Sequence, residues 1–384
     1  MKTIREAEVK GKRVIVRVDF NVSVRGGVVD DDFRIRASIP TISLLRERGA
    51  KIVLISHRGR PEGPDPSLSL RAIGMHLSKL LSCPVTFFED FQAAQEGVEL
   101  MEEGDVALLE NIRFESGEEE ASEAFAGRLA QLGTIYVNDA FAVSHRKHAS
   151  VFVLPHLLDS YAGLLLASEV EALDAIRSSE SKPVVLILGG AKVESKVRVV
   201  EGLLERVDAV CVGGIAANSI LAARGVSVGA SLIENGEVAE YIRGLDLPHD
   251  KVFLPVDAVV ASSVDDESGA REVAIQDVGK EDMILDIGPQ TVALFSATME
   301  GAKTIFWNGP MGRFETEAFA KGTKALIEAL SKTSARVVVG GGDVMAAIDE
   351  SGARDVVDYA STGGGAMLEY LAQGTLPGIE ALHS

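Results

Sequence analysis

The sequence predicts an α/β fold made of two domains, each built on a parallel sheet. Short, continuous apolar runs alternate with stretches of helical pattern along the whole chain. Continuous rather than alternating apolar strands are typical of parallel sheets that helices cover on both faces. A length of 384 residues exceeds what one hydrophobic core usually holds, so two such sheets in series are the simplest architecture.

The first part of the chain is expected to form one sheet with helices between its strands. The strands are expected at 13–18, 51–55, 85–88, 106–109 and 134–137, and the helices around 37–48, 70–81 and 118–132. The proline-rich stretch 60–66 predicts a loop.

The second part repeats this alternation. Its strands are expected at 184–188, 209–212, 252–254, 283–287, 303–306 and 337–339. A leucine-rich helix at about 163–176 is the expected connector, and the serine-rich stretch 178–183 predicts a linker on its hinge side.

Four glycine clusters follow apolar runs in this second part: Gly189–Gly190, Gly213–Gly214, Gly340–Gly342 and Gly363–Gly365. Each cluster alone fits a tight turn between a strand and a helix. Glycine is costly to order, however, and close approach of the backbone to a ligand is a common reason for it. Free N–H groups where helices begin bind anions, so four clusters favour a ligand that carries phosphate.

The charge of the chain excludes some partners. A net charge of −19 argues against nucleic acid and anionic membranes, which both need a basic surface. The chain begins without an apolar signal segment and has no run long enough to span a membrane, so a cytoplasmic location is expected. Cys83 and Cys211 lie far apart in or beside apolar segments and are expected to be free thiols.

Residues 1–60 are basic in an otherwise acidic chain, with 14 Lys and Arg against 7 Asp and Glu. Polar residues also follow the expected strands, where parallel sheets bind ligands. Forked arginine donors match phosphate and carboxylate oxygens, although single arginines are usually surface residues. The candidates for an anion site are Asp19, Asn21, Arg34, His57, Arg60, Arg113 and Arg146.

Lys192 and Lys196 begin the helix after Gly189–Gly190. Like charges four residues apart repel, and cations oppose the dipole where a helix begins, so an anion held between them would remove both penalties. The alternative is that Glu194 and Arg198 pair on this helix and the lysines are solvated. The chain has neither a P-loop nor a dinucleotide fingerprint, and no residues at the spacing of a zinc site.

Ten short blocks, in order along the chain, resemble phosphoglycerate kinase. The blocks are 17–22, 56–61, 109–114, 138–141 with His145 and Arg146, 189–196, 254–257, 286–289, 307–312, 340–343 and 361–366. The resemblance implies an α/β fold of two Rossmann-like three-layer domains whose parallel sheets face each other across a cleft, joined by the long connecting helix. The domains would be 1–157 plus 367–384 for phosphoglycerate, and 158–366 for the nucleotide.

The resemblance also implies the reaction. The enzyme would transfer a phosphoryl group reversibly between 1,3-bisphosphoglycerate and ADP, giving 3-phosphoglycerate and ATP, as a magnesium-dependent kinase of glycolysis and gluconeogenesis. Transfer would be direct and in line, on hinge-bending domain closure. The family is mostly monomeric.

The site residues are carried over by matching position. The glycerate would be held by Asp19, Asn21, Arg34, His57, Arg60, Arg113 and Arg146. The nucleotide would be held by Lys192, Lys196, Gly213, Gly214, Asn308, Pro310, Glu315, Gly342, Asp343 and Gly363, with Asp343 serving Mg²⁺. The catalytic residues would be Arg34, Lys192, Gly364 and Gly365.

Several residues depart from the family pattern. Ser195 replaces an aspartate between the two lysines, Ile215 and Ala216 replace glycine and methionine, and Arg313 replaces an aliphatic residue near the expected adenine pocket. Val344 replaces a hydroxyl residue after Asp343, and Arg58 replaces a leucine beside His57. These changes leave nucleotide base preference open. Two alternatives also stay open, a catalytically silent nucleotide-binding relative and a kinase of another small carboxylate.

Overall fold

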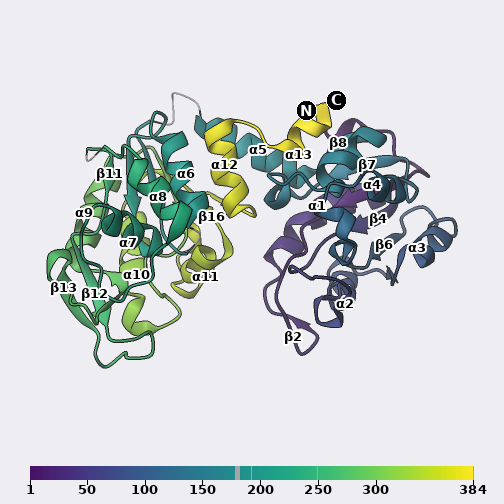
Figure 1. Cartoon of the computed structure of the whole chain (residues 1–384). Helices are drawn as coiled ribbons and strands as arrows, with labels where there is room; N and C mark the ends of the chain where they lie inside the picture. The colour runs from purple at the N-terminus through teal and green to yellow at the C-terminus, as the bar shows by residue number, and fades with distance from the viewer. Residues whose placement is uncertain (178–181, 192, 249, 384) are drawn as a thin grey trace. The chain divides into compact units, whose positions relative to one another are not determined.

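The computed structural model describes residues 1–177, 182–191, 193–248 and 250–383 (Figure 1). The chain divides into two compact units. Unit 1 comprises Met1–Glu171 and Gly374–Ser384, and unit 2 comprises Ala172–Gln373. The structural division falls after 171 and 373, whereas the sequence places domain boundaries after 157 and 366. The later second boundary follows from α12 (Gly364–Gln373), which packs along α6 (Val193–Leu203) of unit 2.

Unit 1 is built on a six-stranded parallel sheet with the order β5-β6-β4-β1-β7-β8. Its strands are β1 (Arg13–Arg17), β4 (Lys51–Ile55), β5 (Val85–Phe88), β6 (Val106–Leu109), β7 (Ile135–Asn138) and β8 (Asp159–Ala162). Its helices are α1 (Phe33–Glu47), α2 (Arg71–Leu81), α3 (Phe91–Val98), α4 (Glu123–Ala130) and α13 (Pro377–Glu380). A hairpin of β2 (Val24–Arg25) and β3 (Val28–Val29) precedes α1.

The five strands expected in this part are confirmed, and β8 is an additional strand. The helix expected at 118–132 is shorter in the structure. Ala121 has a positive φ of 54°, and the Ser122 hydroxyl accepts a hydrogen bond from the N–H of Phe125 at 3.3 Å. This side-chain cap begins α4 at Glu123, because it satisfies one of the N–H groups that the first turn leaves free.

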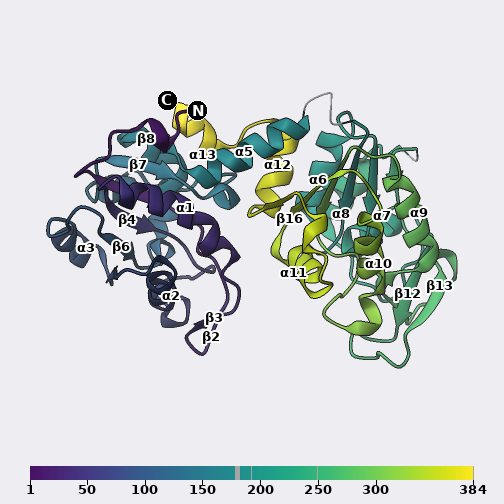
Figure 2. The same ribbon diagram turned by 180° about the vertical axis from the view of Figure 1, so that it is seen from behind.

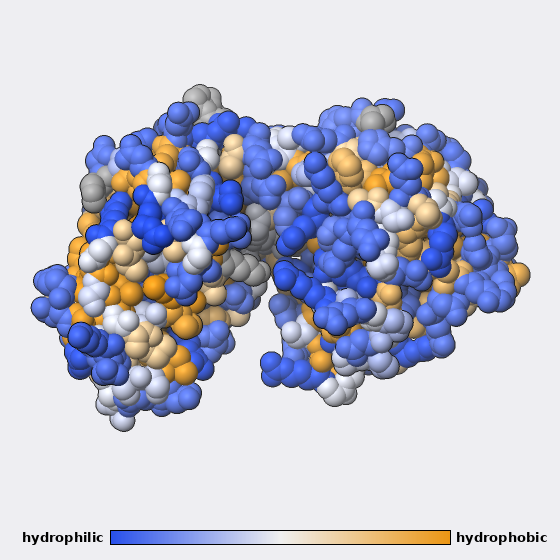
Figure 3. Space-filling view, in the orientation of Figure 1, coloured by the Kyte–Doolittle hydropathy of each residue, from blue (hydrophilic) through white to orange (hydrophobic). Residues whose placement is uncertain are grey.

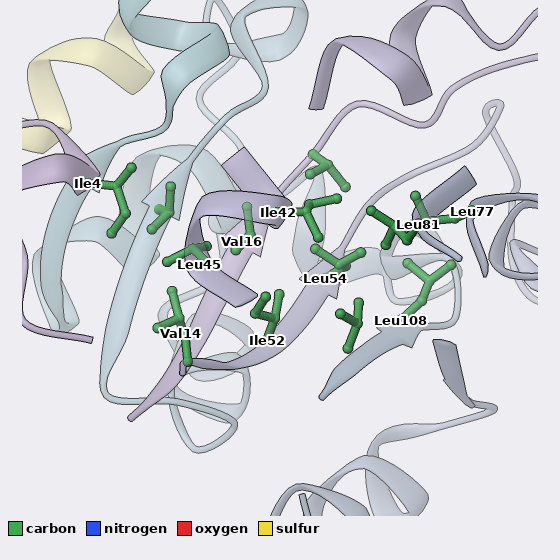
Figure 4. Packing of buried hydrophobic residues seen from close by; sticks show 14 of the residues in the cluster. Ile4, Val14, Val16, Ile42, Leu45, Ile52, Leu54, Leu77, Leu81 and Leu108 are labelled. Atoms are coloured by element: carbon green, nitrogen blue, oxygen red, sulfur yellow. The ribbon is translucent and has the colours of Figure 1, made fainter. Parts of the chain in front are cut away.

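One large hydrophobic cluster of unit 1 lies between the sheet and the helices of one face (Figure 4). Side chains of β1, β4 and β6 meet those of α1 and α2 there; among those shown are Val16, Leu54, Ile42 and Leu77, each fully buried. Burial contributes about 25 cal/mol per Å² of apolar surface, so this layer helps to hold the sheet whose edge carries the polar residues.

Unit 2 contains a second six-stranded parallel sheet, with the order β11-β10-β9-β15-β16-β17. Its strands are β9 (Val184–Leu188), β10 (Ala209–Val212), β11 (Val252–Phe253), β15 (Thr304–Asn308), β16 (Arg336–Gly340) and β17 (Tyr359–Ser361). Its further helices are α7 (Gly214–Ala223), α8 (Gly236–Gly244), α9 (Pro289–Met299), α10 (Lys321–Leu330) and α11 (Gly342–Glu350).

One strand prediction in unit 2 is wrong in its placement. The run at 283–287 is β14 (Met283–Ile287), which pairs antiparallel with β12 (Asp257–Ala261) in a separate sheet β13-β12-β14, where β13 is Arg271–Ala274. A short apolar run looks the same in either sheet, because its hydrophobicity does not specify the direction of its partner.

The connecting helix α5 (Leu164–Arg177) begins where it was expected and extends from unit 1 into unit 2. Its first turn is anchored by two side chains of unit 1. Thr41 Oγ1 accepts from the N–H of Leu164, and Asp139 Oδ1 accepts from the N–H of Leu165, both at 2.9 Å. The linker predicted at 178–183 lies mostly outside the described residues.

The final segment of the described chain packs on unit 1, beside the N-terminus, as both ribbon views show (Figure 2). Gly378 N–H donates to the Ser144 carbonyl at 2.8 Å, and Asn138 Nδ2 donates to the Gly378 carbonyl at 3.1 Å. Asn138 ends β7, so this segment contacts the edge of the sheet directly.

Hydrophilic residues cover most of the visible face of unit 1, whereas the visible face of unit 2 also carries a hydrophobic area across its middle (Figure 3). Within the described residues, no helix has both the length and the apolar character that crossing a bilayer requires.

Candidate functional site

The carboxyl ends of three neighbouring strands lie level at one edge of the unit 1 sheet. Arg17, at the end of β1, is in register with Ile55 of β4 and with Asn138 of β7. The segments that follow these strands therefore begin side by side, which is the position where open parallel sheets bind ligands. Most of the expected anion-binding residues come from these segments.

Arg34, Asp19 and Asn21 form one hydrogen-bonded group at this edge. Arg34, in the first turn of α1, donates from Nη1 to Asp19 Oδ2 at 2.9 Å and to the Asn21 carbonyl at 3.3 Å. Asn21 Oδ1 accepts from the N–H of Gly59 at 2.9 Å. The Asp19 side chain is buried and that of Arg34 is 29% exposed, so the guanidinium is fixed on one side and open on the other.

His57 is buried beside the same group and is neutral. Arg17 Nη2 lies 3.1 Å from His57 Nδ1, and an arginine can only donate, so Nδ1 accepts and the ring proton is on Nε2. Burial lowers the pKa of His57 well below its usual value, and the positive charges of Arg17 and Arg113 lower it further. His57 can therefore donate a hydrogen bond to an anion but does not supply a charge.

Behind His57 lies a buried charged network that the sequence did not reveal. Arg17 donates from Nε to Ser150 Oγ at 2.8 Å, and that hydroxyl donates to Glu118 Oε1 at 2.6 Å. Glu118 also accepts from the N–H of Ser150 at 2.9 Å. Burial raises the pKa of Glu118, and the nearby Arg17 opposes this increase. Glu118 is the first of three consecutive glutamates in the sequence, and such an acidic run predicts solvated surface.

Arg113 is joined to the same region, while Arg60 and Arg146 extend from it. Arg113 Nη1 donates to the Gly59 carbonyl at 2.6 Å, and its Nε lies 3.0 Å from Glu119 Oε1. Arg146 is exposed but close enough to Arg113 to lower its pKa. Arg60 is exposed on the loop after Gly59. His148 is also nearby, and its pKa is lowered to about 4, mainly by burial and then by Arg113.

The sheet of unit 2 presents main chain, rather than charged side chains, at its corresponding edge. Asn308 at the end of β15 is in register with Leu188 of β9 and with Gly340 of β16. The glycine clusters follow these aligned strand ends. A Cβ on Gly189 would lie 2.0 Å from the Pro310 carbonyl oxygen, and one on Gly213 would lie 2.7 Å from the Met311 sulfur. At Gly189 the contact is with main chain, so that position cannot accept a side chain without displacement of the loop.

Lys196 and Asn308 are the polar side chains at the centre of this edge. Lys196 is buried and donates from Nζ to the Gly189 carbonyl. Asn308 donates from Nδ2 to the Gly340 carbonyl at 2.6 Å, and a Cβ on Gly364 would lie 2.8 Å from the same nitrogen. The structure thus brings Lys196, Asn308 and the glycine loops together. Lys192 lies outside the described residues.

Gly214 and Gly363 also belong to this group of loops. Gly214 has a φ of 60° and faces the main chain of Gly190, where a Cβ would lie 2.7 Å from the Gly190 nitrogen. Gly363 is buried immediately before α12. Gly365, in the first turn of α12, is exposed.

Glu315 and Asp343 are exposed, and no hydrogen bond or ion pair among the described residues joins either side chain to the glycine loops. Asp343 lies in the first turn of α11, directly after Gly342. Gly341, which precedes this helix, has a φ of 107° that a side chain would strain. The residues that the structure describes contain no group of three metal-ligating side chains.

Two aspartates of the sequence motifs have structural roles. Asp257 accepts hydrogen bonds from the N–H groups of Gln290 and Thr291, which open α9, at 2.9 and 2.7 Å. Asp286 accepts from the N–H of Gly322 in the first turn of α10 at 2.7 Å. Burial raises the pKa of Asp286 to about 7. Both side chains therefore satisfy free N–H groups where helices begin.

The departures from the expected pattern have different environments. Val344 is fully buried in the core of unit 2, so it contributes packing in place of a polar contact. Ala216 is buried and Ile215 half-buried in α7, while Arg313 is exposed. Arg58 is buried in unit 1. Nothing is described for the side chain of Ser195.

Comparison with known proteins places the chain among the phosphotransferases that use a carboxyl group as acceptor. The family model described as phosphoglycerate kinase matches residues 4–374, and the chain belongs to that family. The phosphoglycerate kinase of Thermomicrobium roseum is 46% identical over 388 residues, covering 100% of this chain and 99% of that protein. That of Rubrobacter xylanophilus is 45% identical over 383 residues, with 99% and 98% covered.

Solved structures agree with these relatives. The phosphoglycerate kinase of Coxiella burnetii has a TM-score of 0.81 and 38% identity, and the match covers 99% of this chain and 98% of that one. That of Pyrococcus horikoshii has a TM-score of 0.87 and 33% identity, with 100% and 98% covered. The predicted family and α/β fold are thereby confirmed, and with them phosphoglycerate kinase activity in glycolysis.

Proposed function

We propose that unit 1 binds 3-phosphoglycerate or 1,3-bisphosphoglycerate, that unit 2 binds the magnesium nucleotide, and that the phosphoryl group passes directly between them. The carrying observation is the group of Arg34, Asp19, His57, Arg17 and Arg113 at one sheet edge of a protein with a net charge of −19. Fixed, positively charged donors gathered in an otherwise negative protein suit a small anion that carries both a phosphate and a carboxylate.

The proposed reaction needs positioning and charge stabilisation more than acid–base chemistry. In the direction of ATP use, the nucleophile is a carboxylate with a pKa of roughly 3.5, which is ionised at neutral pH without a general base. His57, neutral and fixed by Arg17, acts as a hydrogen-bond donor to the glycerate. Arg34, fixed by Asp19, stabilises the charge that develops on the transferred group.

In unit 2, we assign the nucleotide to the loops around Lys196, Asn308 and Pro310, with Gly213 and Gly214 beside them. Close-packed main chain without side chains lets phosphate oxygens approach N–H groups. The open starts of α11 and α12, at Gly342 and Gly363–Gly365, supply further such groups. Glu315 is assigned to the ribose hydroxyls and Lys192 to the transferring phosphates, both from the family pattern.

Asp343 is the residue that would hold Mg²⁺. Mg²⁺ is usually bound by one or two carboxylates together with substrate phosphates and water, so a single exposed carboxylate beside a phosphate site fits it. The lack of a three-ligand cluster among the described residues agrees with an ion that arrives with its nucleotide. When bound, the ion would neutralise phosphate charge.

Direct transfer places a further requirement on the chain, because the two substrates are assigned to different units. We propose that a closing motion brings the bound substrates together and excludes water, which would hydrolyse the acyl phosphate. We expect the chain to act as a monomer, since each assigned binding group lies within one unit.

The proposal is tested by a coupled assay of the purified protein with MgATP and either 3-phosphoglycerate or glycerate. Turnover with 3-phosphoglycerate, and at least about a hundredfold lower kcat/KM with glycerate, is expected, because a site built for a phosphate leaves buried donors unpaired without it. Equal use of glycerate would show that another small carboxylate is the substrate. No turnover with 3-phosphoglycerate would contradict the proposal altogether.

A further inference from the structure

Arg58 is a buried cation that the proposed site does not use. Its neighbours His57 and Arg60 are assigned to the glycerate, but its own side chain is directed to main-chain oxygens. Nε donates to the Val22 carbonyl at 3.1 Å, and Nη1 donates to the carbonyls of Ser67 at 2.7 Å and Ser69 at 3.3 Å. Only 8% of the residue is exposed.

The oxygens that Arg58 binds belong to two different loops. Val22 directly follows Asn21, in the loop after β1. Ser67 and Ser69 lie in the loop that runs from Arg60 to α2. A planar guanidinium has donors in a fixed fork, so one side chain that bonds to both loops determines their separation.

The backbone of Arg58 is fixed as firmly as its side chain. Its N–H donates to Asn111 Oδ1 at 3.1 Å, and its carbonyl accepts from Asn111 Nδ2 at 2.7 Å. Asn111 lies in the segment after β6 that carries Arg113. The guanidinium is therefore held to the sheet edge, and the two loops are held to the guanidinium.

The charge of Arg58 has no direct partner to explain it. Among the described side chains, no carboxylate lies within 4.0 Å of its nitrogens, and Asp65 and Glu110 act on it only from a distance. Burial lowers its pKa, which is the expected cost of a cation whose partners are neutral oxygens. Leucine, which the family pattern has here, could bury its side chain without that cost but could not bind the loops.

We propose that Arg58 is a positioning residue of the glycerate site, whose guanidinium sets the spacing between the Asn21 loop and the Arg60 loop. The proposal rests on the glycerate assignment of unit 1 given above. The contact that reports this spacing is the hydrogen bond from Gly59 N–H to Asn21 Oδ1, at 2.9 Å. Asn21 also accepts from Arg34 through its carbonyl at 3.3 Å, but the shorter bond from Arg34 to Asp19, at 2.9 Å, holds the guanidinium independently of the Asn21 loop.

The test compares Arg58→Met, Arg58→Gln and Arg58→Lys with the matched control Arg48→Met. Arg48 binds three main-chain oxygens of unit 1 in the same way, those of Ile4, Arg5 and Ala7, but away from the site. Hydrogen exchange of the Gly59 amide and the KM values for 3-phosphoglycerate and ATP are measured on each full-length protein.

For Arg58→Met, we expect about tenfold faster exchange at Gly59 and about a tenfold higher KM for 3-phosphoglycerate, with kcat and the KM for ATP within twofold, because a hydrogen bond to a charged group is lost. Arg58→Gln, which keeps a neutral donor, should fall between Arg58→Met and the wild type. Arg48→Met should leave both readouts unchanged.

Three results would overturn the proposal. The first is unchanged Gly59 exchange in Arg58→Met. The second is a KM that is equal in Arg58→Gln and Arg58→Met but normal in Arg58→Lys, which would indicate a pure charge effect. The third is an equal rise in KM in the Arg48→Met control. Because Gly59 exchange needs no substrate, it still tests the Arg58 contacts if the wild type proves inactive with 3-phosphoglycerate.

Discussion

Unit 1 lines the carboxyl edge of its sheet mainly with charged side chains that bond to one another, whereas unit 2 lines the equivalent edge mainly with glycine-rich main chain. In unit 1, Arg34 is held by Asp19, and His57 by Arg17. In unit 2, a Cβ on Gly189 or Gly214 would lie 2.0 or 2.7 Å from main-chain atoms. On the proposed assignments, one fold would bind phosphate in two ways, by forked donors in unit 1 and by exposed N–H groups in unit 2.

This contrast predicts different responses to substitution. Removing a side chain in unit 1 should abolish a specific interaction and leave the fold intact. An added Cβ in unit 2 should instead distort the loops. The main-chain atoms that it meets at Gly189 and Gly214 cannot rotate out of the way as the end of a side chain can.

The largest effect is expected for Arg34→Ala. Turnover with 3-phosphoglycerate should fall about a thousandfold, the lower range for an arginine that stabilises a transferring phosphoryl group, while ATP affinity and the melting temperature stay near wild type. The coupled assay and ATP titration measure this. Arg36→Ala is the matched control, since Arg36 is exposed on the same helix and pairs with Asp32. Near wild-type turnover of Arg34→Ala would remove Arg34 from the mechanism.

A smaller effect, of a different kind, is expected for Gly364→Ala. The added Cβ would lie 2.8 Å from Asn308 Nδ2, which is fixed by the Gly340 carbonyl, so the free energy of unfolding should fall by about 1–3 kcal/mol. The KM for ATP should rise about tenfold as Asn308 moves. Gly365→Ala, with nothing within 4 Å of its Cβ, should change the unfolding free energy by less than about 1 kcal/mol. Equal stability of the two variants would contradict the steric argument.

A pH experiment tests a feature that the two units share. Burial raises the pKa of Asp139 in unit 1 and of Asp286 in unit 2 to about 7, from 3.8. Between these values the folded state keeps a proton that the unfolded state has lost, so each group lowers the free energy of unfolding as pH rises, by about 1.4 kcal/mol per pH unit.

Asp139→Asn and Asp286→Asn should each reduce this slope between about pH 4 and 7 in urea unfolding, because asparagine still accepts a hydrogen bond but does not titrate. Asp266→Asn is the control. The pKa of Asp266 is lowered, chiefly by the Ser262 hydroxyl, so its contribution changes only at more acidic pH. A slope unchanged in the first two variants would mean that both aspartates are ionised at neutral pH.

The smallest change is expected in the protonation of His57, which should stay constant between pH 6 and 8. Its lowered pKa predicts that nitrogen-15 NMR shows the neutral ring with the proton on Nε2 throughout pH 6–8. Comparison with His57→Gln assigns the signal. A protonated ring at pH 6 would mean that the histidine contributes charge to the site, and it would contradict the assignment of His57 as a neutral donor.

The fold class could be predicted because continuous apolar runs are a local property of the sequence. These runs indicate most strands of the two parallel sheets directly. The antiparallel sheet of β12, β13 and β14 could not be predicted in this way, because strand direction depends on partners far along the chain. Most of the arginines assigned to the proposed glycerate site were chosen because they follow expected strands. Glu118 was missed because three consecutive glutamates look solvated, although the first of them is fully buried against Ser150.

Arg17 shows the same limit from the opposite direction. It ends an apolar run, where a charged residue is usually taken as the point at which a strand emerges into water. Its burial depends on Ser150 and His57, which are distant in sequence and contact it only in the folded chain. Burial of a charge is thus a property of tertiary contacts that no local pattern encodes.

The discontinuous makeup of unit 1 has a consequence for how the protein is made. The residues from Gly374 onward belong to this unit, and Gly378 bonds to both Ser144 and Asn138. During synthesis the first 171 residues leave the ribosome long before this segment exists, while unit 2 is still being translated. The end of β7 therefore stays uncovered until the segment after Gln373 has been translated and packs on it. Unit 1 is the first unit to be synthesised and the last to be completed.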